Sequence, residues 1–497
     1  NFIMKKLAAK LWAVLMLILI SMQSMATDVF TSNRTDFRDE SIYFMITTRF
    51  YDGDPKNNVL CWDNQAAQIE TKDPCWRGDF QGVIDKLDYI KALGFTAIWI
   101  TPVVQNASGY DYHGYHAMDF QHVDCRYQSS DGSKSGDVMF QELIDKAHAK
   151  GIKIILDIVL NHTGNFGEEK LCKLFDRNTQ LRNQAYIDAC MTPTETLGSD
   201  YLTILPKDQY HRRLTMMKNM DGQNRDIHNY WHHYGQFGWD DPSRWWGQIA
   251  GDCVDLNTEN DEVAKYLVDC YGQFIKMGVD GFRIDTSGHI SRLTFNHQFV
   301  PQFAALGEKY KDKRINQAPF FMYGEVCTRG HEATYRGQAN LSCYFYTWKS
   351  DESLMNQWDG SQSFWDSQVL PEGSGPIGPQ ALCGKETFGD KKSENAKMIN
   401  GAWHEPDYSE ASGFNVIDFP MHYSYNTAKD AFRLSAEDEL YNDATYNVVY
   451  IDSHDYSPGP NDLNRFGGTD AQWAENLSLL FTFRGIPCLY YGSEVGF

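Results

Sequence analysis

Residues 278–290 (GVDGFRIDTSGHI) contain the side chains best suited to chemistry. Arg283 and Asp285 lie two positions apart in an apolar, β-branched segment, so on a strand both point to the same face. The arginine charge keeps a neighbouring aspartate ionised. An ionised carboxylate at the C-terminal end of a strand is what a covalent nucleophile in sugar chemistry requires. A buried ion pair on a core strand is the alternative, and the motif alone does not decide between the two.

Two further carboxylates and two histidines also follow apolar segments that predict strands. Glu325 ends MYGE, Asp455 ends YIDSHD with His454 beside it, and His162 follows LDIVLN. Taken singly, each carboxylate has an ordinary interpretation as a helix cap or a surface charge. If the strands form a barrel, their carboxyl ends meet on one face, where active sites of such folds lie. The sequence therefore predicts a catalytic site built from several strand ends.

The elements that must position these residues alternate between amphipathic and apolar segments. The alternation predicts helices at 83–93, 137–150, 261–277 and 300–310. Eight strands are predicted, the first beginning at Ile42 and the others at 95–101, 152–160, 278–284, 320–324, 415–419, 448–452 and 488–491. A helix followed by a buried strand, repeated, is typical of a parallel sheet closed by crossover helices. The predicted fold is a (β/α)₈ TIM barrel of the α/β class.

Two long segments interrupt this alternation. Residues 163–254 are polar and aromatic, include the run NYWHHYGQFGWDDPSRWWGQ at 229–248, and predict a subdomain inserted after the third strand. Residues 326–413 predict a long insertion after the fifth strand, with no assignable role. The barrel would then consist of residues 27–162 and 255–497.

The two ends of the chain carry separate signals. Residues 1–26 combine positive charges, an apolar run at 11–20 and the small-x-small site Ser-Met-Ala, which predicts a signal peptide and an exported protein, secreted or periplasmic. An uncleaved membrane anchor is the alternative, although the run is short for a span. Because Phe497 follows closely on the eighth strand, we expect a piece of a longer protein that lacks its last helix and a C-terminal β domain.

Composition limits the partners of the protein. The chain has 497 residues and a formal net charge of −21, and no long basic cluster interrupts the acidity. Such a charge argues against nucleic acid or an anionic membrane surface as a partner. We expect a monomer with no membrane span once the signal is cleaved. Of the 11 cysteines, Cys61 with Cys75 and Cys172 with Cys190 are the first disulfide pairs to consider, although sequence leaves the connectivity open.

An oxygen-rich loop follows the first predicted strand. Asp52, Asp54, Asn57 and Asn58 lie within YDGDPKNN, and Asp79 lies beyond Cys75 in WRGDF. Calcium prefers six to eight such oxygen ligands. The loop is a plausible Ca²⁺ site, and an Asx-rich turn that binds nothing is the alternative.

Four stretches together make the sequence recognisable. In chain order they are LDIVLNHTG, GVDGFRIDTSGHI, FMYGEV and VVYIDSHD, with GFTAIWITPV, YDYHGY, VDLN and GIPCLYYGSE as further matches. The sequence resembles the α-amylase family of glycoside hydrolases, the thirteenth in the usual numbering, over almost the whole chain after the predicted signal. An ordered set of motifs is a far stronger signal than any one of them.

The resemblance implies a retaining mechanism and a set of roles. Asp285 would be the nucleophile, Glu325 the acid and base, and Asp455 the third carboxylate that supports the transition state. Substrate-binding residues would be Arg283, His162, His454, the stacking Tyr115, His113 and His289.

The resemblance also implies two calcium sites. Asn161 and Asp255, with the backbone carbonyl of His289, would hold a central Ca²⁺. The loop of Asp52, Asp54, Asn57, Asn58 and Asp79 looks like a second site found in the cyclodextrin-forming branch.

The sequence departs from the family pattern at three places. Gly288 stands where many α-amylases have lysine, which leaves specificity on the leaving-group side open, and Ser453 stands where asparagine is common. Residues 326–413 are longer than the family leads us to expect. The predicted activity is endo-hydrolysis of α-1,4-glucosidic bonds in starch, glycogen and malto-oligosaccharides. Cyclomaltodextrinase, neopullulanase or glucanotransferase activity is the alternative, and a catalytically dead glucan-binding barrel is a third, which the complete set of Arg283 and three carboxylates opposes.

Overall fold

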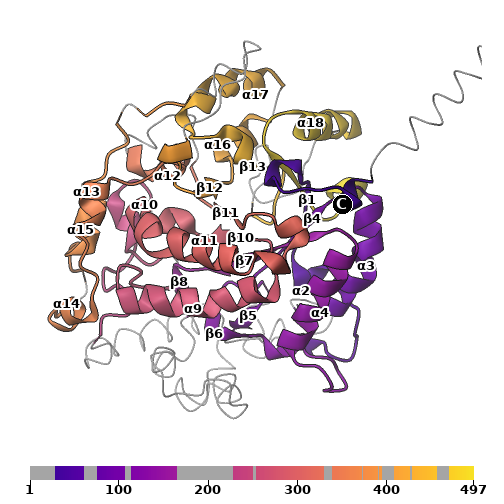
Figure 1. Ribbon diagram of the computed structural model, residues 1–497, viewed down its shortest axis with the longest axis horizontal. Coiled ribbons are helices and arrows are strands. Elements are labelled where there is room, and N and C mark those ends of the chain that lie inside the picture. The colour runs from indigo at the N-terminus through magenta and orange to yellow at the C-terminus, as the bar shows by residue number, and fades with distance from the viewer. Residues whose placement is uncertain are drawn as a thin grey trace, which may run out of the picture.

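The computed structural model describes residues 28–60, 75–106, 113–164, 228–249, 253–328, 339–371, 373–389, 391–393, 408–425, 428–455 and 469–496 (Figure 1). The predicted signal peptide at 1–26 lies outside these residues, as do Cys61, Cys172 and Cys190. No helix among the described residues is long and apolar enough to cross a membrane.

Eight parallel strands form one sheet in which spatial order follows chain order. They are β1 (Ile42–Met45), β4 (Ala97–Ile100), β7 (Lys153–Val159), β10 (Gly281–Asp285), β11 (Phe321–Gly324), β12 (Asn415–Val416), β13 (Val448–Val449) and β14 (Ile486–Tyr490). In this order β1 lies between β4 and β14, and the two ends of the sheet are β12 and β13. A parallel bridge between Ile417 and Val448 joins these two ends. The predicted (β/α)₈ barrel is confirmed, with β12 and β13 much shorter than their predicted segments.

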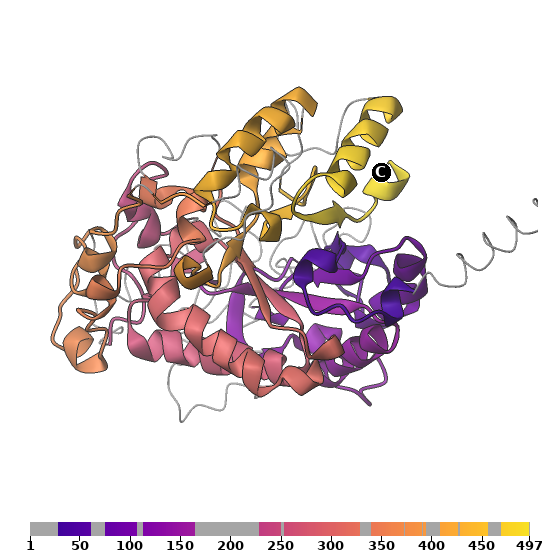
Figure 2. The same cartoon turned by 45° about the horizontal axis from the view of Figure 1, so that its top comes forward.

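Helices cover the outside of the barrel (Figures 1 and 2). The main ones are α3 (Phe80–Ala92), α4 (Gly136–Ala149), α9 (Asp261–Met277), α11 (Val300–Lys309), α16 (Phe419–Ser424), α17 (Ala428–Leu434) and α18 (Asp470–Thr482). The sequence sets the ends of α9: the Asn260 side chain accepts from the Glu262 N–H, and Gly278 ends the helix at φ 111°. The four helices predicted from periodicity lie within about three residues of α3, α4, α9 and α11.

Alternation along each strand divides the core into two parts. On β10, Phe282 and Ile284 belong to the cluster that packs the barrel against its helices. Arg283 points the other way, toward Trp99, which belongs to the cluster inside the barrel. A period of two therefore places charged side chains inside the barrel while the same strand holds its helices with apolar ones.

The two predicted insertions are described in part. Short strands β8 (His162–Gly164) and β9 (Cys253–Asp255) pair antiparallel, which brings together the two ends of the predicted subdomain at 163–254. Residues 165–227 and 250–252 lie outside the described part of the chain. Within 326–413 lie the short helices α12 (Cys343–Tyr346), α13 (Glu352–Met355), α14 (Gln362–Asp366) and α15 (Pro379–Cys383). The domain boundaries themselves stay a prediction.

Candidate active site

Arg283 and Asp285 lie on β10 and meet on one face, as their spacing predicts. The Arg283 Nη1 donates to Asp285 Oδ1 over 2.7 Å. Arg283 is only 1% exposed, and its guanidinium lies 5.0 Å from the centroid of the Trp99 ring. A charge buried this deeply is costly unless its partners are arranged around it.

Glu325 follows β11 and shares the same guanidinium. Arg283 Nη2 donates to Glu325 Oε2 over 2.9 Å, and the Thr286 N–H donates to the same oxygen over 3.2 Å. Thr286 adopts φ 46°, a left-handed conformation that is strained for a β-branched residue. The turn directly after Asp285 therefore binds the second predicted catalytic carboxylate, and one arginine joins both.

Asp157 on β7 is a third member of this cluster, which the sequence analysis missed. The strand register places it opposite Arg283, whose Nη1 lies 3.1 Å from each of its carboxylate oxygens. Asp157 Oδ2 also accepts from Trp99 Nε1 over 3.1 Å and from the Tyr115 hydroxyl over 2.9 Å. A charged residue within the apolar run LDIVL is the signal that could have identified it.

Three carboxylates around one guanidinium leave excess negative charge in a buried place. Burial raises the pKa of Glu325, the charge of Asp285 raises it further, and Arg283 opposes both. Burial also raises the pKa of Asp157 to about 8. Glu325 and Asp157 therefore each retain a proton to a higher pH than an isolated carboxyl does.

Tyr115, His454 and Asp455 form a chain of contacts beside Asp157. The Tyr115 hydroxyl lies 3.0 Å from His454 Nε2, which lies 3.3 Å from Asp455 Oδ2. Burial lowers the pKa of His454, which favours the neutral imidazole. The predicted residues His162 and His113 both contact the Tyr115 backbone. His162 Nε2 lies 3.0 Å from the Tyr115 carbonyl oxygen, and the Tyr115 N–H donates to His113 Nδ1 over 3.1 Å.

A pocket of about 250 Å³ brings most of these residues together. Its lining consists of Asp285, Glu325, Asp455, Tyr115, His162 and His289 from the predicted set, with Trp239, Arg244, Ile249, Cys253, Thr286 and Cys327. Trp239 and Arg244 belong to the aromatic run at 229–248, for which the sequence predicts no role. The geometry suits acid-base and nucleophilic chemistry on a substrate held between carboxylates.

Asn161 and Asp255, predicted for a central calcium, are neighbours. Asn161 Nδ2 donates to Asp255 Oδ1 over 3.0 Å, and Asp255 Oδ2 lies 2.5 Å from His232 Nδ1. His232 Nε2 lies 2.7 Å from Glu259, and although burial lowers its pKa, the Glu259 and Asp255 carboxylates raise it to about 9. Both oxygens of Asp255 already have partners, Asn161 Nδ2 and His232 Nδ1, so the pair fits calcium only in part.

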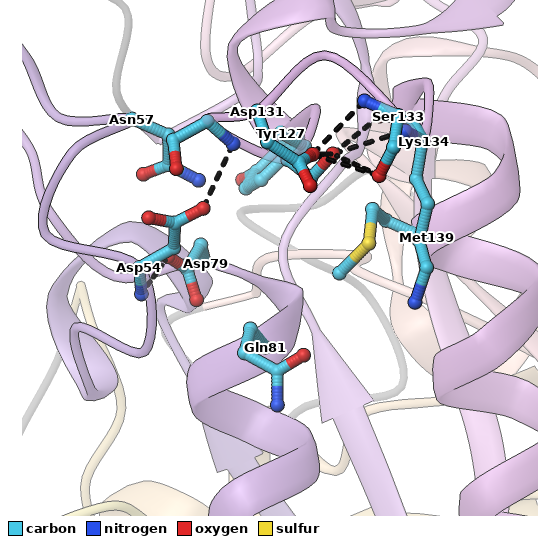
Figure 3. A pocket seen from close by; sticks show the side chains of 11 residues that line it. Asp54, Asn57, Asp79, Gln81, Tyr127, Asp131, Ser133, Lys134 and Met139 are labelled. Atoms are coloured by element: carbon cyan, nitrogen blue, oxygen red, sulfur yellow. Dashed lines mark hydrogen bonds between the residues drawn. The ribbon is translucent and has the colours of Figure 1, made fainter.

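The predicted second calcium loop gathers oxygen atoms around a pocket of about 220 Å³. Asp54, Asn57 and Asp79 lie on one side of it, with Ser133 and Lys134 across from them (Figure 3). Asp79 also serves as the N-cap of α3: its Oδ1 accepts from the Gly82 N–H over 2.6 Å and its Oδ2 from the Asp54 N–H over 2.9 Å.

Asp52 carries the observation that favours a cation at this loop. Its Oδ2 accepts from Asn58 Nδ2 over 2.9 Å, whereas its Oδ1 is buried with no hydrogen-bond partner in the described part of the chain. A buried carboxylate oxygen without a donor is costly, and a bound cation would relieve that cost. Within the described ranges, no group of three or more His, Cys, Asp or Glu side chains has metal-binding spacing, so amide or backbone oxygens would have to complete either site.

Comparisons with known proteins agree with the fold. A model of the alpha-amylase catalytic domain matches residues 44–347. A beta/alpha-amylase of Paenibacillus polymyxa is 29% identical over 485 residues, covering 94% of this chain and 28% of that protein. A cyclomaltodextrin glucanotransferase of Bacillus sp. (strain 1011) is 27% identical over 500 residues, covering 97% and 53%. The chain thus spans about half the length of these relatives or less.

Solved structures show the same fold. An Anoxybacillus alpha-amylase structure has a TM-score of 0.54 at 22% identity, covering 93% of this chain and 73% of that one. The match to the catalytic-domain model extends over more than half of the chain and includes Asp285 and Glu325. The protein therefore belongs to the alpha-amylase family of glycoside hydrolases.

Proposed function

We propose that the protein is an exported, retaining α-amylase that cleaves internal α-1,4-glucosidic bonds in starch, glycogen and malto-oligosaccharides. The observation that carries this proposal is the single guanidinium of Arg283, which contacts Asp285 through Nη1 and Glu325 through Nη2 at the wall of one pocket. Retention needs its two carboxyl groups about 5–5.5 Å apart. Two carboxylates on adjacent nitrogens of one arginine suit that short separation.

In the first step Asp285 attacks the anomeric carbon as the bond from that carbon to the glycosidic oxygen breaks. Glu325 donates its proton to the departing oxygen, and its raised pKa keeps that proton available. The products are a glycosyl-enzyme ester and a released sugar chain.

In the second step Glu325 acts as a base. It takes a proton from water, the water oxygen bonds to the anomeric carbon, and the ester bond to Asp285 breaks. The configuration at the anomeric carbon is inverted twice and therefore retained. Asp455, which lines the pocket and is half exposed, would hold sugar hydroxyls while positive charge develops on the ring.

Glucanotransferase activity is the second candidate, and the names of the relatives favour it, because several of them are cyclomaltodextrin glucanotransferases. The first step would be the same. A sugar hydroxyl would replace water in the second, so the residues that bind the acceptor would decide between hydrolysis and transfer.

Calcium would act on structure in this proposal. At the loop site, Asp52, Asp54, Asn57, Asn58 and Asp79 would hold the ion, and at the central site Asn161, Asp255 and the His289 carbonyl would do so. A bound Ca²⁺ would neutralise the clustered carboxylates and fix the loops that carry them.

Product analysis tests the proposal. The protein is incubated with soluble starch, pullulan and β-cyclodextrin, each with calcium and with a chelator. Mixed linear malto-oligosaccharides from starch, with little attack on the other two, would support an α-amylase. Cyclic products from starch would establish the transferase, and preferred hydrolysis of pullulan or cyclodextrin would move the protein to the neopullulanase or cyclomaltodextrinase branch.

A further inference from the structure

The described part of the insertion after β11, at 326–413, packs against the turn that follows Asp285. This turn consists of the 3₁₀ segment Ser287–His289 and the short helix α10 (Arg292–Thr294). Two insertion helices, α12 and α15, lie beside α10 (Figure 1). Because Thr286 and His289 line the catalytic pocket, whatever positions this turn also shapes the site.

The turn is strained and contacts the acid. Thr286 adopts φ 46°, and its N–H donates to Glu325 Oε2 over 3.2 Å. The His289 N–H donates to the Thr286 carbonyl over 2.8 Å, and the Ile290 N–H donates to the Ser287 carbonyl over 3.1 Å. A strained backbone persists only where its surroundings fix it. Strand β10 fixes the first end of the turn, so the second end must be held as well.

Hydroxyl contacts from the insertion hold that second end. The Tyr346 hydroxyl, on α12, donates to the Ile290 carbonyl over 2.7 Å. The Ser291 hydroxyl donates to Cys383 Sγ on α15 over 2.9 Å and accepts from the Thr294 N–H over 3.0 Å. Tyr346 and Cys383 are buried, so water does not compete for these contacts.

A buried ion pair joins the insertion to α10. Arg292 Nη2 donates to Glu386 Oε1 over 3.0 Å, and its Nε donates to Oε2 over 3.4 Å. The two side chains are 2% and 1% exposed. Arg292 Nη1 also donates to the Phe345 carbonyl over 3.3 Å, and the guanidinium lies 3.5 Å from the Phe345 ring centroid. Moving α10 would separate buried opposite charges, which is costly.

These contacts connect the insertion to the acid without touching substrate. Glu386 is buried and is not among the residues that line the pocket. Its partner Arg292 begins α10, and the turn before α10 ends at the Thr286 N–H that binds Glu325. A small displacement of a catalytic group by a distant change can cost much of the rate.

We propose that the insertion after β11 clamps the turn that follows the nucleophile, with Glu386 and Tyr346 as positioning residues that keep the Thr286 N–H directed at Glu325. The inference rests on the proposed function, because it gives this part of the chain a role in that reaction.

Two conservative variants, Glu386→Gln and Tyr346→Phe, each remove one of the contacts that hold the turn. Both should lower kcat on maltopentaose about tenfold and leave KM within about twofold of wild type, because the acid moves while the sugar-binding side chains remain. If Glu386→Gln does not fold, Tyr346→Phe, which removes only a hydroxyl, decides.

The pH profile gives a second measurement. Burial raises the pKa of Glu325, and the hydrogen bond from the Thr286 N–H opposes that rise. Loosening Thr286 should therefore raise this pKa further. The alkaline limb of kcat/KM for maltopentaose should move to higher pH in both variants.

Glu40→Gln is the matched control. Arg34 and Glu40 form an ion pair of similar length, 3.1 Å, with side chains 3% and 0% exposed. Glu40 also lies 2.7 Å from Lys153, the first residue of β7, and thus at the opposite end of the strands from the pocket. This variant should lower Tm at least as much as Glu386→Gln, since two buried cations lose a partner. Its kcat, KM and pH profile, measured well below Tm, should match wild type.

Two results would overturn the clamp. One is a wild-type kcat and alkaline limb in the folded variants of the clamp. The other is the same kinetic losses in Glu40→Gln, which would make them a general consequence of lower stability. A wild-type protein that is inactive on maltopentaose would instead overturn the proposed function, and the clamp with it.

Discussion

The negative charge of two acidic clusters in this molecule is compensated in different ways. At the barrel mouth, Asp285, Glu325 and Asp157 surround the buried guanidinium of Arg283. In the second cluster, Asp79 at the start of α3 and Asp54 accept hydrogen bonds from backbone N–H groups, and one oxygen of Asp52 is buried without a described donor. The first cluster carries its own cation, whereas the second would gain from one taken from solution. A buried arginine leaves part of each carboxylate accessible to substrate, which suits catalysis. A metal ion bound from solution would instead be coordinated by the carboxylate oxygens, which suits stabilisation of the fold.

The largest expected effect comes from the nucleophile. Asp285→Asn removes the attacking oxygen but keeps the shape of the side chain, so kcat on soluble starch should fall on the order of 10⁴-fold or more. Binding should survive, measured by retardation of the inactive variant in starch-containing native gels. A variant that retained appreciable turnover would show that Asp285 is not the nucleophile.

Arg283→Lys tests whether one guanidinium must serve both carboxylates. Lysine keeps the charge but cannot contact Asp285 and Glu325 through two adjacent nitrogens, so kcat should fall roughly 10²–10³-fold while KM changes little. Steady-state kinetics on maltopentaose measures the effect. Wild-type kcat in a folded variant would mean that charge alone is sufficient and that the bridging geometry is incidental.

The pH dependence of activity follows from the raised pKa of Glu325. The acid must carry its proton, and a raised pKa means that the proton is lost only at a higher pH than for an ordinary glutamate. The kcat/KM for maltopentaose should therefore fall on the alkaline side as pH rises through that pKa, at a higher pH than for an ordinary glutamate.

Fluoride needs little protonation to leave, so the alkaline fall should be much weaker with α-maltosyl fluoride. The same alkaline limb for both substrates would assign it to a group other than the acid.

The smallest effect is expected at the loop cluster and should appear in stability. Removing calcium with a chelator should lower Tm by several degrees, because a ligand that binds only the folded state stabilises it by mass action. Asp52→Asn should lose most of this response.

Asp131→Asn is the control for the loop, since Asp131 lines the same pocket but is not a predicted ligand. Differential scanning calorimetry with calcium and with magnesium measures the shifts. An unchanged Tm in the wild type on chelation would contradict the metal assignment.

Local pattern was enough to predict the elements of the barrel and the residues at its mouth. The period of two on β10 placed Arg283 and Asp285 on one face, and the helix ends of α9 follow from Asn260 and Gly278, because such features depend on neighbours in the chain. The order of the motifs predicted that Glu325 and Asp455 follow later strands of the same barrel.

Only the tertiary structure determined which carboxylates contact the guanidinium of Arg283. Asp157 lies opposite Arg283 because of the register between β7 and β10, and register joins residues 126 positions apart. The contact between Arg292 and Glu386 was equally hidden. Irregular segments have no period from which a position can be inferred, and their side chains are positioned by packing against strands distant in the sequence.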